Sequence, residues 1–398
     1  MLKKGHLHTV ILAGVIFLMS FMVTGCWDRK EIENRGFVLG GAIDKVITPA
    51  PKGEYDLPHV TQEAGERKYK VTVEMPRFKK GEENVTGGKE NHYIFSGEGE
   101  SMFQIVRAIG AKTYFSPFFE DLQVLIFSEA VAREGIKDLL DFGLRNPTMR
   151  RGVKVFVTPG RAEDILKGKM QVAEINSIFI AKTSQNVKMT PRFATVTSLG
   201  EVAQAIRAKR SFGVAEIVME NGDVKLTKGA IFNAEGKMVG ELDEWEIVGG
   251  KIIRRVLKEG AFSIPNPANP EKLAVFEVVE PRIKVNSHVD GDKLWFTLEA
   301  ELAGHLGENT ETEQKALDPV FLMAVERAMA DEFTRMVQVA YHKHQELRAD
   351  ALGLGSLVYR QHPEYWNMVK DRWDEEVFPQ TPIDVNIKVI IRRPGMIS

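Results

Sequence analysis

Apolar residues recur along the 398-residue chain with two different spacings, and each spacing predicts one kind of element. Every second residue of Tyr69–Met75 is apolar, as in a strand with one buried face. In residues 102–109 the apolar positions lie three and four apart, the spacing of an amphipathic helix. Short continuous apolar runs at 122–128 and 153–157 predict buried strands. We therefore expect a mixed α+β domain over residues 26–205.

The next region has a different pattern. Residues 206–270 contain short apolar runs separated by Asn-Gly and other glycine turn signals, which predicts a small β-rich middle domain. Three prolines within Ile264–Pro270 indicate a linker at its end. A chain of this length exceeds the roughly 250–300 residues at which one core usually stops growing. A third domain is therefore expected over residues 271–398.

The third region combines a hairpin, a long helix and a terminal strand. Asp290-Gly291 predicts the turn between two long strands. Asp318 before Pro319 is typical of a helix start. The helix then carries one apolar stripe, made of Phe321, Val325, Met329, Phe333, Met336 and Ala340. Alternating residues from Ile383 onward predict a half-buried antiparallel strand. The expected architecture is α+β with three mixed domains, the C-terminal one an antiparallel sheet packed with long helices.

Charge and cysteine content restrict the function. The chain has 53 basic and 55 acidic residues, so it has no excess of positive charge with which to neutralise a phosphate backbone. We expect no nucleic-acid partner. One cysteine in the whole chain cannot form an internal disulfide or a CxxC metal or redox pair. The cellular compartment must therefore be inferred from targeting signals.

The amino terminus carries such a signal. Lys3 and Lys4 precede a largely apolar run, Val10–Val23. This run is shorter than the roughly 20 apolar residues of a spanning helix but typical of the apolar part of a signal peptide. We expect residues 1–25 to be a lipoprotein signal peptide.

The single cysteine, Cys26, follows this run directly. Val23, Thr24 and Gly25 place a branched apolar residue and two small residues before it, as recognition by the signal peptidase at a bacterial lipobox requires. Cys26 would become an N-palmitoyl and S-diacylglycerol cysteine, and membrane attachment would depend on these acyl chains. Two alternatives stay open, a buried structural cysteine and an uncleaved transmembrane anchor.

Few residues have the spacing that catalysis or metal binding requires. His342 and His344 are two apart and would point in different directions on a helix, so we expect both to face solvent. The sequence has no HExxH motif, no nucleophile elbow and no phosphate loop. Trp366 and Trp373, seven apart, are expected to be packing anchors. We therefore expect no enzyme activity, no cofactor and no metal.

Three arginines near the end of a predicted helix allow two interpretations, one functional and one structural. Arg145, Arg150 and Arg151 could form a corner that docks a partner or an anion. The other interpretation is a helix end whose arginines pair with nearby acidic residues such as Asp141.

Three segments together resemble a known family. Cys26–Glu33, followed by FVLGGAIDK, resembles the start of the Ger(x)C family, the lipoprotein C subunits of spore-germination nutrient receptors. Phe118–Val157 and Tyr359–Gly395 resemble two further segments of that family. The resemblance extends over essentially the whole mature chain.

The resemblance implies a three-domain α+β ectodomain that diacylglycerol on Cys26 anchors to the outer face of the spore inner membrane. It also implies assembly with two membrane proteins, the A and B subunits of the receptor. Such a C subunit is required for germination in response to nutrients, and no catalytic activity is ascribed to it.

Two other classes of function stay open. A substrate-binding lipoprotein of a transporter also begins with a lipobox, but it typically has two similar α/β lobes, whereas the second half of this chain predicts a hairpin, a long helix and a terminal strand. An exported hydrolase would need a nucleophile constellation that the sequence does not contain.

Overall fold

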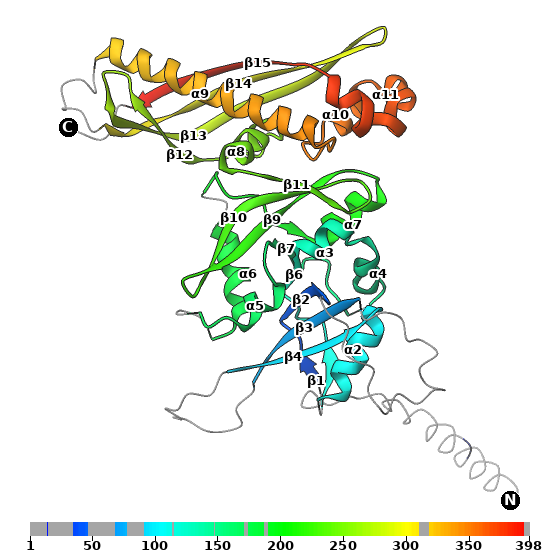
Figure 1. Ribbon diagram of the computed structural model, residues 1–398. Helices are drawn as coiled ribbons and strands as arrows, with labels where there is room; N and C mark the ends of the chain where they lie inside the picture. Colours follow the sequence, from blue (N-terminus) through cyan, green and yellow to red (C-terminus); the bar gives the residue numbers. More distant parts are fainter. Residues whose placement is uncertain are drawn as a thin grey trace, which may run out of the picture.

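The computed structural model describes residues 14, 35–46, 68–77, 91–113, 115–146, 148–170, 174–186, 190–309 and 318–393. The chain forms two lobes stacked end to end, each built around its own sheet (Figure 1). We call residues 35–242 the N-terminal lobe and residues 260–393 the C-terminal lobe. The mixed α and β architecture agrees with the prediction from the sequence.

A nine-stranded mixed sheet forms the centre of the N-terminal lobe. Its order is β11-β10-β9-β7-β6-β2-β3-β4, with β8 paired to β7. The four central strands β2, β6, β7 and β9 are parallel, and antiparallel strands extend both edges. The strands are β2 Gly40–Lys45, β3 Tyr69–Pro76, β4 His92–Gly99, β6 Val124–Ser128, β7 Lys154–Thr158, β8 Thr197–Ser198, β9 Phe212–Glu220, β10 Asp223–Phe232 and β11 Met238–Leu242.

Helices cover both faces of this sheet. One face packs against α2 Met102–Ala111, α3 Glu129–Glu134, α4 Lys137–Arg145 and α7 Leu199–Arg207. The other packs against α5 Ala162–Lys167 and α6 Asn176–Asn186. A small parallel pair, β1 Arg35–Phe37 with β5 Ser116–Phe118, lies at the end of the molecule away from the C-terminal lobe (Figure 1). Because helices cover both faces, β3 buries Thr72 and Glu74 as well as its predicted apolar face.

The C-terminal lobe consists of a four-stranded sheet and the long helix that crosses it. Asp318 caps this helix by accepting the N–H of Val320 at 3.0 Å, and all six residues of the predicted stripe are buried. The predicted hairpin turns at Gly291, whose φ is +59°. The elements are β12 Gly260–Asn266, β13 Asn269–Asp290, β14 Lys293–Asn309, α9 Pro319–Glu346, α10 Leu354–Gln361, α11 Pro363–Val369 and β15 Ile383–Arg393. Short 3₁₀ and π turns join α11 to β15.

Two expectations about this lobe were wrong. β15 pairs with β14 in parallel, not antiparallel, because the helical connection from α9 to α11 returns the chain to the end at which β14 begins. The prolines of Ile264–Pro270 do not form a linker, since they lie in the β12–β13 hairpin. β12 is an edge strand, so Pro265 can be accommodated there without a sheet hydrogen bond on its outer side.

The sheets divide the chain at a different place from the predicted domain boundaries. β9, β10 and β11 lie in the predicted middle domain but complete the nine-stranded sheet, whereas β12 joins the C-terminal sheet. The division into domains at residues 205 and 270 stays a prediction.

Helix α8, Glu244–Ile253, connects the two lobes. Its start is a capping box, in which Asp243 accepts the N–H of Trp245 and of Glu246 at 2.8 Å. Val248 and Ile252 belong to the core of the C-terminal lobe, while Ile247 belongs to a core of the N-terminal lobe. The same helix is therefore buried in both.

Helices α8 and α9 approach each other most closely at Gly249. A Cβ atom at this position would lie 2.0 Å from the carbonyl oxygen of Met336 and 2.7 Å from Cβ of Ala340. At Gly250 the nearest atom to an added Cβ is Cδ2 of Leu352, at an ordinary 3.6 Å. Only the first of these neighbouring glycines is required by close packing.

We predict opposite effects of alanine at the two positions. Gly249→Ala should lower the free energy of unfolding by about 3 kcal/mol, because the methyl group would force α8 away from α9. Gly250→Ala should raise it by about 0.5–1 kcal/mol, because alanine restricts the unfolded chain and fits the helix. Urea unfolding followed by circular dichroism measures both, and equal effects would show that the helix crossing is not tight at Gly249.

Candidate functional site

The residues predicted for lipid attachment cannot be placed. Cys26 and the recognition residues Val23, Thr24 and Gly25 lie outside the described residues. Their roles stay predictions from the sequence. Among the described residues, no helix is long and apolar enough to cross a membrane.

The three arginines considered for docking do not share one environment. Nε of Arg145 donates to Asp141 at 2.7 Å within α4, as the structural interpretation expects. Nη2 of Arg150 lies 3.6 Å from Oε1 of Glu120, and the side chain of Arg151 is exposed. A docking role for this corner stays a prediction.

The histidine pair on α9 differs from the prediction. His342 is exposed, but His344 is only 2% exposed, and its Nδ1 lies 2.7 Å from the carbonyl oxygen of Ala340. Exposure was therefore the wrong expectation for His344. The cause is tertiary, because His344 points to a cavity that it lines together with Gly213 of β9 and Lys251 of α8.

The tryptophan pair behaves as predicted. The rings of Trp366 and Trp373 meet at 5.3 Å between centroids. Nε1 of Trp373 donates to the buried carboxylate of Asp350 at 3.0 Å. Both indoles therefore serve packing within the C-terminal lobe.

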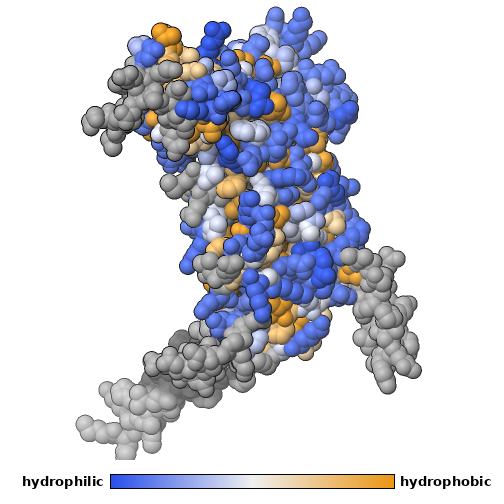
Figure 2. Space-filling view, turned by 60° about the vertical axis from the view of Figure 1, so that its left-hand side comes forward, coloured by the Kyte–Doolittle hydropathy of each residue, from blue (hydrophilic) through white to orange (hydrophobic). Residues whose placement is uncertain are grey.

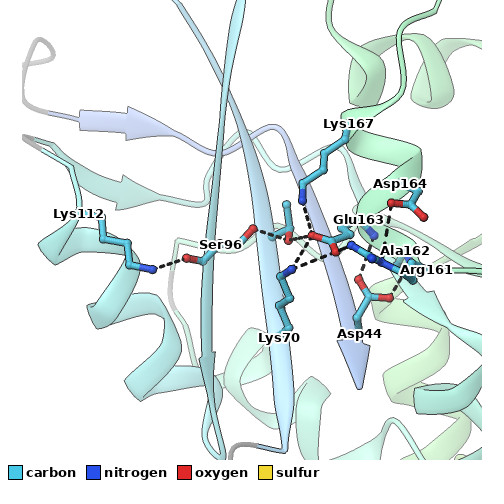
Figure 3. Close-up of polar contacts among 10 residues, drawn as sticks. Asp44, Lys70, Ser96, Lys112, Arg161, Ala162, Glu163, Asp164 and Lys167 are labelled. Atoms are coloured by element: carbon cyan, nitrogen blue, oxygen red, sulfur yellow. Dashed lines mark hydrogen bonds and ion pairs between the residues drawn. The ribbon is translucent and has the colours of Figure 1, made fainter. Parts of the chain in front are cut away.

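A charge cluster around one buried carboxylate lies between β3 and α5 in the N-terminal lobe, and Figure 3 shows three cations around that carboxylate. We call Lys70, Arg161, Glu163 and Lys167 the Glu163 cluster. Glu163 is 1% exposed, and its carboxylate lies 2.9 Å from Nζ of Lys70 and 2.5 Å from Nζ of Lys167. Arg161 forms a further ion pair with it. The central carboxylate thus has three positive partners.

Asp44 of β2 caps helix α5 beside this cluster (Figure 3). Its two carboxylate oxygens accept the N–H groups of Ala162, at 2.6 Å, and Glu163, at 2.9 Å. Burial raises the pKa of Asp44. The hydrogen bond from the backbone N–H of Ala162 and the positive charge of Arg161 oppose that rise. Asp44 and Glu163 are therefore occupied in holding α5 against the sheet, which leaves neither as an available acid or base.

Sequence reasoning missed this cluster. Lys70 and Glu163 are 93 residues apart, and the alternation of β3 predicts a solvent face for Lys70. The only signal was the mixed polar composition of that face, where Thr72 and Glu74 also lie. In the ranges that the structure describes, no group of three or more His, Cys, Asp or Glu residues could hold a metal ion.

A second set of polar contacts joins the lobes. Ser211 donates to Asp374 at 2.8 Å, and Arg210 donates to Ser356 at 3.3 Å. Asp350 lies nearby and accepts hydrogen bonds from three backbone N–H groups, which favour its charged form. Burial and the negative charge of Asp374 outweigh this effect and raise the pKa of Asp350 to about 7. These groups fix the start of α10 and its position against the N-terminal lobe.

We predict that Glu163 is essential for stability and that its outer partner is not. Glu163→Gln should lower the free energy of unfolding by roughly 2–3 kcal/mol, because the buried side chain would lose its charge-assisted hydrogen bonds from Lys70 and Lys167. Lys167→Met should cost less than about 1 kcal/mol, because Lys167 is 42% exposed and two other cations remain. Urea unfolding of both variants tests this; similar small losses would show that the cluster does not stabilise the lobe.

We also predict a specific acid sensitivity at His344. Burial and the charge of Arg254 lower the pKa of His344 to about 4. A histidine held neutral stabilises the fold above its unfolded pKa of about 6.5, and this contribution is lost as the pH falls from about 6.5 to 4.

His344→Gln cannot take up this proton, so its melting temperature should fall less than that of the wild type between pH 7 and 4. The difference corresponds to roughly 3 kcal/mol of pH-dependent stability. Differential scanning calorimetry measures it, and His342→Gln, at the exposed position two residues earlier, is the matched control. Parallel pH profiles for all three proteins would contradict the prediction.

Comparison with known proteins identifies the family. Residues 28–218 match the model described as "Spore germination protein N-terminal domain", and residues 227–395 match "Spore germination B3/ GerAC like, C-terminal". The Bacillus subtilis (strain 168) protein "Spore germination protein YndF" is 26% identical over 96% of both chains. "Spore germination protein B3" of the same organism is 23% identical over 94% of this chain and 96% of its own.

A solved structure has the same fold. The structure titled "Crystal Structure of the GerBC protein" superposes with a TM-score of 0.57 at 20% identity, and the match covers 81% of this chain and 93% of that one. The family matches occupy both lobes, and the relatives match along nearly their whole lengths. The chain therefore belongs to the Ger(x)C family of spore germination proteins.

Proposed function

We propose that this protein is a lipid-anchored, non-enzymatic C subunit of a nutrient germinant receptor and is needed for spore germination in response to nutrients. The observation that carries the proposal is the match of both lobes to spore germination domains. Relatives that match along nearly their whole lengths carry spore germination names, which supports a role of the entire chain in this process.

The anchor belongs to the proposal. Residues 1–25 would be removed, with Val23, Thr24 and Gly25 recognised by the signal peptidase, and Cys26 would receive diacylglycerol and an N-linked palmitoyl group. The first family match begins at residue 28, two positions after Cys26, which supports a mature chain that begins at Cys26.

The fold suggests an orientation for the proposed anchor. Eight residues, 27–34, separate Cys26 from Arg35 of β1, so these two residues are at most about 30 Å apart. β1 lies at the end of the molecule away from the C-terminal lobe (Figure 1). The anchored molecule would therefore hold β1 close to the outer face of the spore inner membrane and the C-terminal lobe away from it.

The proposed partners are the membrane A and B subunits of the receptor. Figure 2 shows a face on which hydrophilic residues predominate and hydrophobic ones lie in small groups. A surface of this kind is suited to polar docking contacts, and the corner of Arg145, Arg150 and Arg151 remains one proposed contact. We expect no nucleic-acid partner, because the chain has 53 basic and 55 acidic residues and thus no excess of positive charge.

The non-enzymatic role is supported by the state of the buried acids. Asp44 and Asp350 accept backbone N–H groups, and Glu163 is surrounded by cations. A general acid or base needs a free position towards a substrate. A substrate-binding lipoprotein of a transporter is less well supported, because the C-terminal lobe does not repeat the architecture of the N-terminal one.

We predict that Cys26→Ala abolishes lipid attachment and impairs nutrient-triggered germination. Without the thiol no thioether to diacylglycerol can form, so palmitate labelling of the protein should disappear and the protein should leave the membrane fraction of spores. The fall in optical density after nutrient addition measures germination. Thr24→Ala keeps a small residue before the cysteine and should behave as the wild type. Normal germination by unlabelled Cys26→Ala spores would refute the anchoring role.

A further inference from the structure

A cavity of about 50 Å³ lies at the joint between the two lobes. Its lining includes Gly213 of β9, Gly250, Lys251 and Arg254 at the end of α8, and His344 of α9. The lining extends from the exposed Arg254 to the buried His344. Since a cavity of about 150 Å³ holds benzene, this one suits a ligand of a few heavy atoms.

Two cations of this lining have no carboxylate partner. Lys251 and Arg254 are three residues apart, so they are neighbours on the surface of α8. Among the described residues, neither forms an ion pair with an acid. Burial, with a smaller contribution from the charge of Arg254, lowers the pKa of Lys251 to about 8. Two like charges therefore lie close together at the edge of the cavity, with Lys251 partly buried and Arg254 at the surface.

The nearest acids are already occupied. Glu201 and Asp350 both attract Arg254 electrostatically. Glu201, however, accepts the N–H and hydroxyl of Ser198 at 2.8 and 2.7 Å. Asp350 accepts three backbone N–H groups and the indole of Trp373. The negative end of α8 stabilises each cation by only about 0.3–1 kcal/mol.

The lining also includes the hydroxyl residue Thr195 and the neutral side chain of His344. Its Nδ1 donates to the carbonyl oxygen of Ala340, so its Nε2 is the atom that can accept a proton. The lining thus combines two unpaired cations with one group that can become protonated when negative charge approaches. Among the described residues, the lining includes no acidic side chain.

We propose that this cavity binds a small oxyanion, either inorganic phosphate or a short carboxylate, through Lys251 and Arg254. Charge-assisted hydrogen bonds from an ammonium and a guanidinium group are well suited to the oxygens of such a ligand. The bound anion would contact α8, which is buried in both lobes, and would thereby stabilise their joint. The proposal does not depend on lipid attachment.

Binding should be coupled to protons. The bound negative charge favours the protonated form of Lys251, so affinity should fall as the pH rises through about 8. The other charged or titratable groups near this site are Arg254, Glu201, Asp350 and His344. Acetate is the suitable probe of this dependence, because its own charge is constant between about pH 6.5 and 9.

The experiment titrates the full-length protein in detergent with sodium phosphate and, separately, with sodium acetate. Sodium chloride at equal ionic strength is the reference, and calorimetry and the melting temperature are the readouts. We expect saturable binding of at least one oxyanion and a higher melting temperature. Binding of phosphate alone, of acetate alone or of both would each support an oxyanion site in the cavity. The pattern identifies which of the two ligands the cavity accepts.

Variants assign the binding to the cavity. Lys251→Met and Arg254→Met should each weaken it about 10-fold or more, the effect of losing a hydrogen bond to a charged group. Lys251→Arg keeps the positive charge and should retain anion binding. This variant tests the role of the charge also in the case that Lys251→Met does not fold. Lys258→Met, at an exposed lysine outside the cavity lining, is the matched control. Absence of saturable binding, or equal binding by a folded Lys251→Met protein, would overturn the proposal.

Discussion

The close contact between α8 and α9 at Gly249 is the constraint on which the relation of the two lobes depends. The backbone of α9 at Met336 occupies the space that any side chain at this position would need. This approach lets α8 place Val248 and Ile252 in the core of the C-terminal lobe while Ile247 packs in the N-terminal lobe. One ten-residue helix thus belongs to both hydrophobic cores, and the unpaired cations at its end lie at the joint.

Buried carboxylates that fix helix starts recur throughout the structure. Asp44 of β2 binds the first N–H groups of α5, and Asp350 binds those of α10. Glu74 of β3 accepts the N–H groups of Asn176, at 3.0 Å, and Ser177, at 2.8 Å, at the start of α6. In each case an acid from outside the helix satisfies N–H groups that the helix itself leaves unpaired. These contacts give the three buried acids Asp44, Glu74 and Asp350 a structural role.

The joined lobes bear on the proposed role as a receptor subunit. The β1 end connects to the proposed anchor through a short segment, and the tightly joined lobes would extend the chain away from the bilayer (Figure 1). Contacts such as Ser211 with Asp374 add polar links across the joint. An anion bound beside Lys251 and Arg254 would act on the same joint, so ligand state and lobe arrangement would be physically coupled.

The sequence by itself determined the local elements, the mixed fold class and the family. The stripe of α9 and its start at Asp318 are visible because helix spacing and caps depend on residues a few positions apart. The tertiary structure alone decided the parallel direction of β15, the burial of His344 and the meeting of Lys70 with Glu163. Those features arise from segments far apart in the chain, and neither periodicity nor composition contains information on which segments meet. The candidate anion cavity belongs to the same class, because its walls come from both lobes.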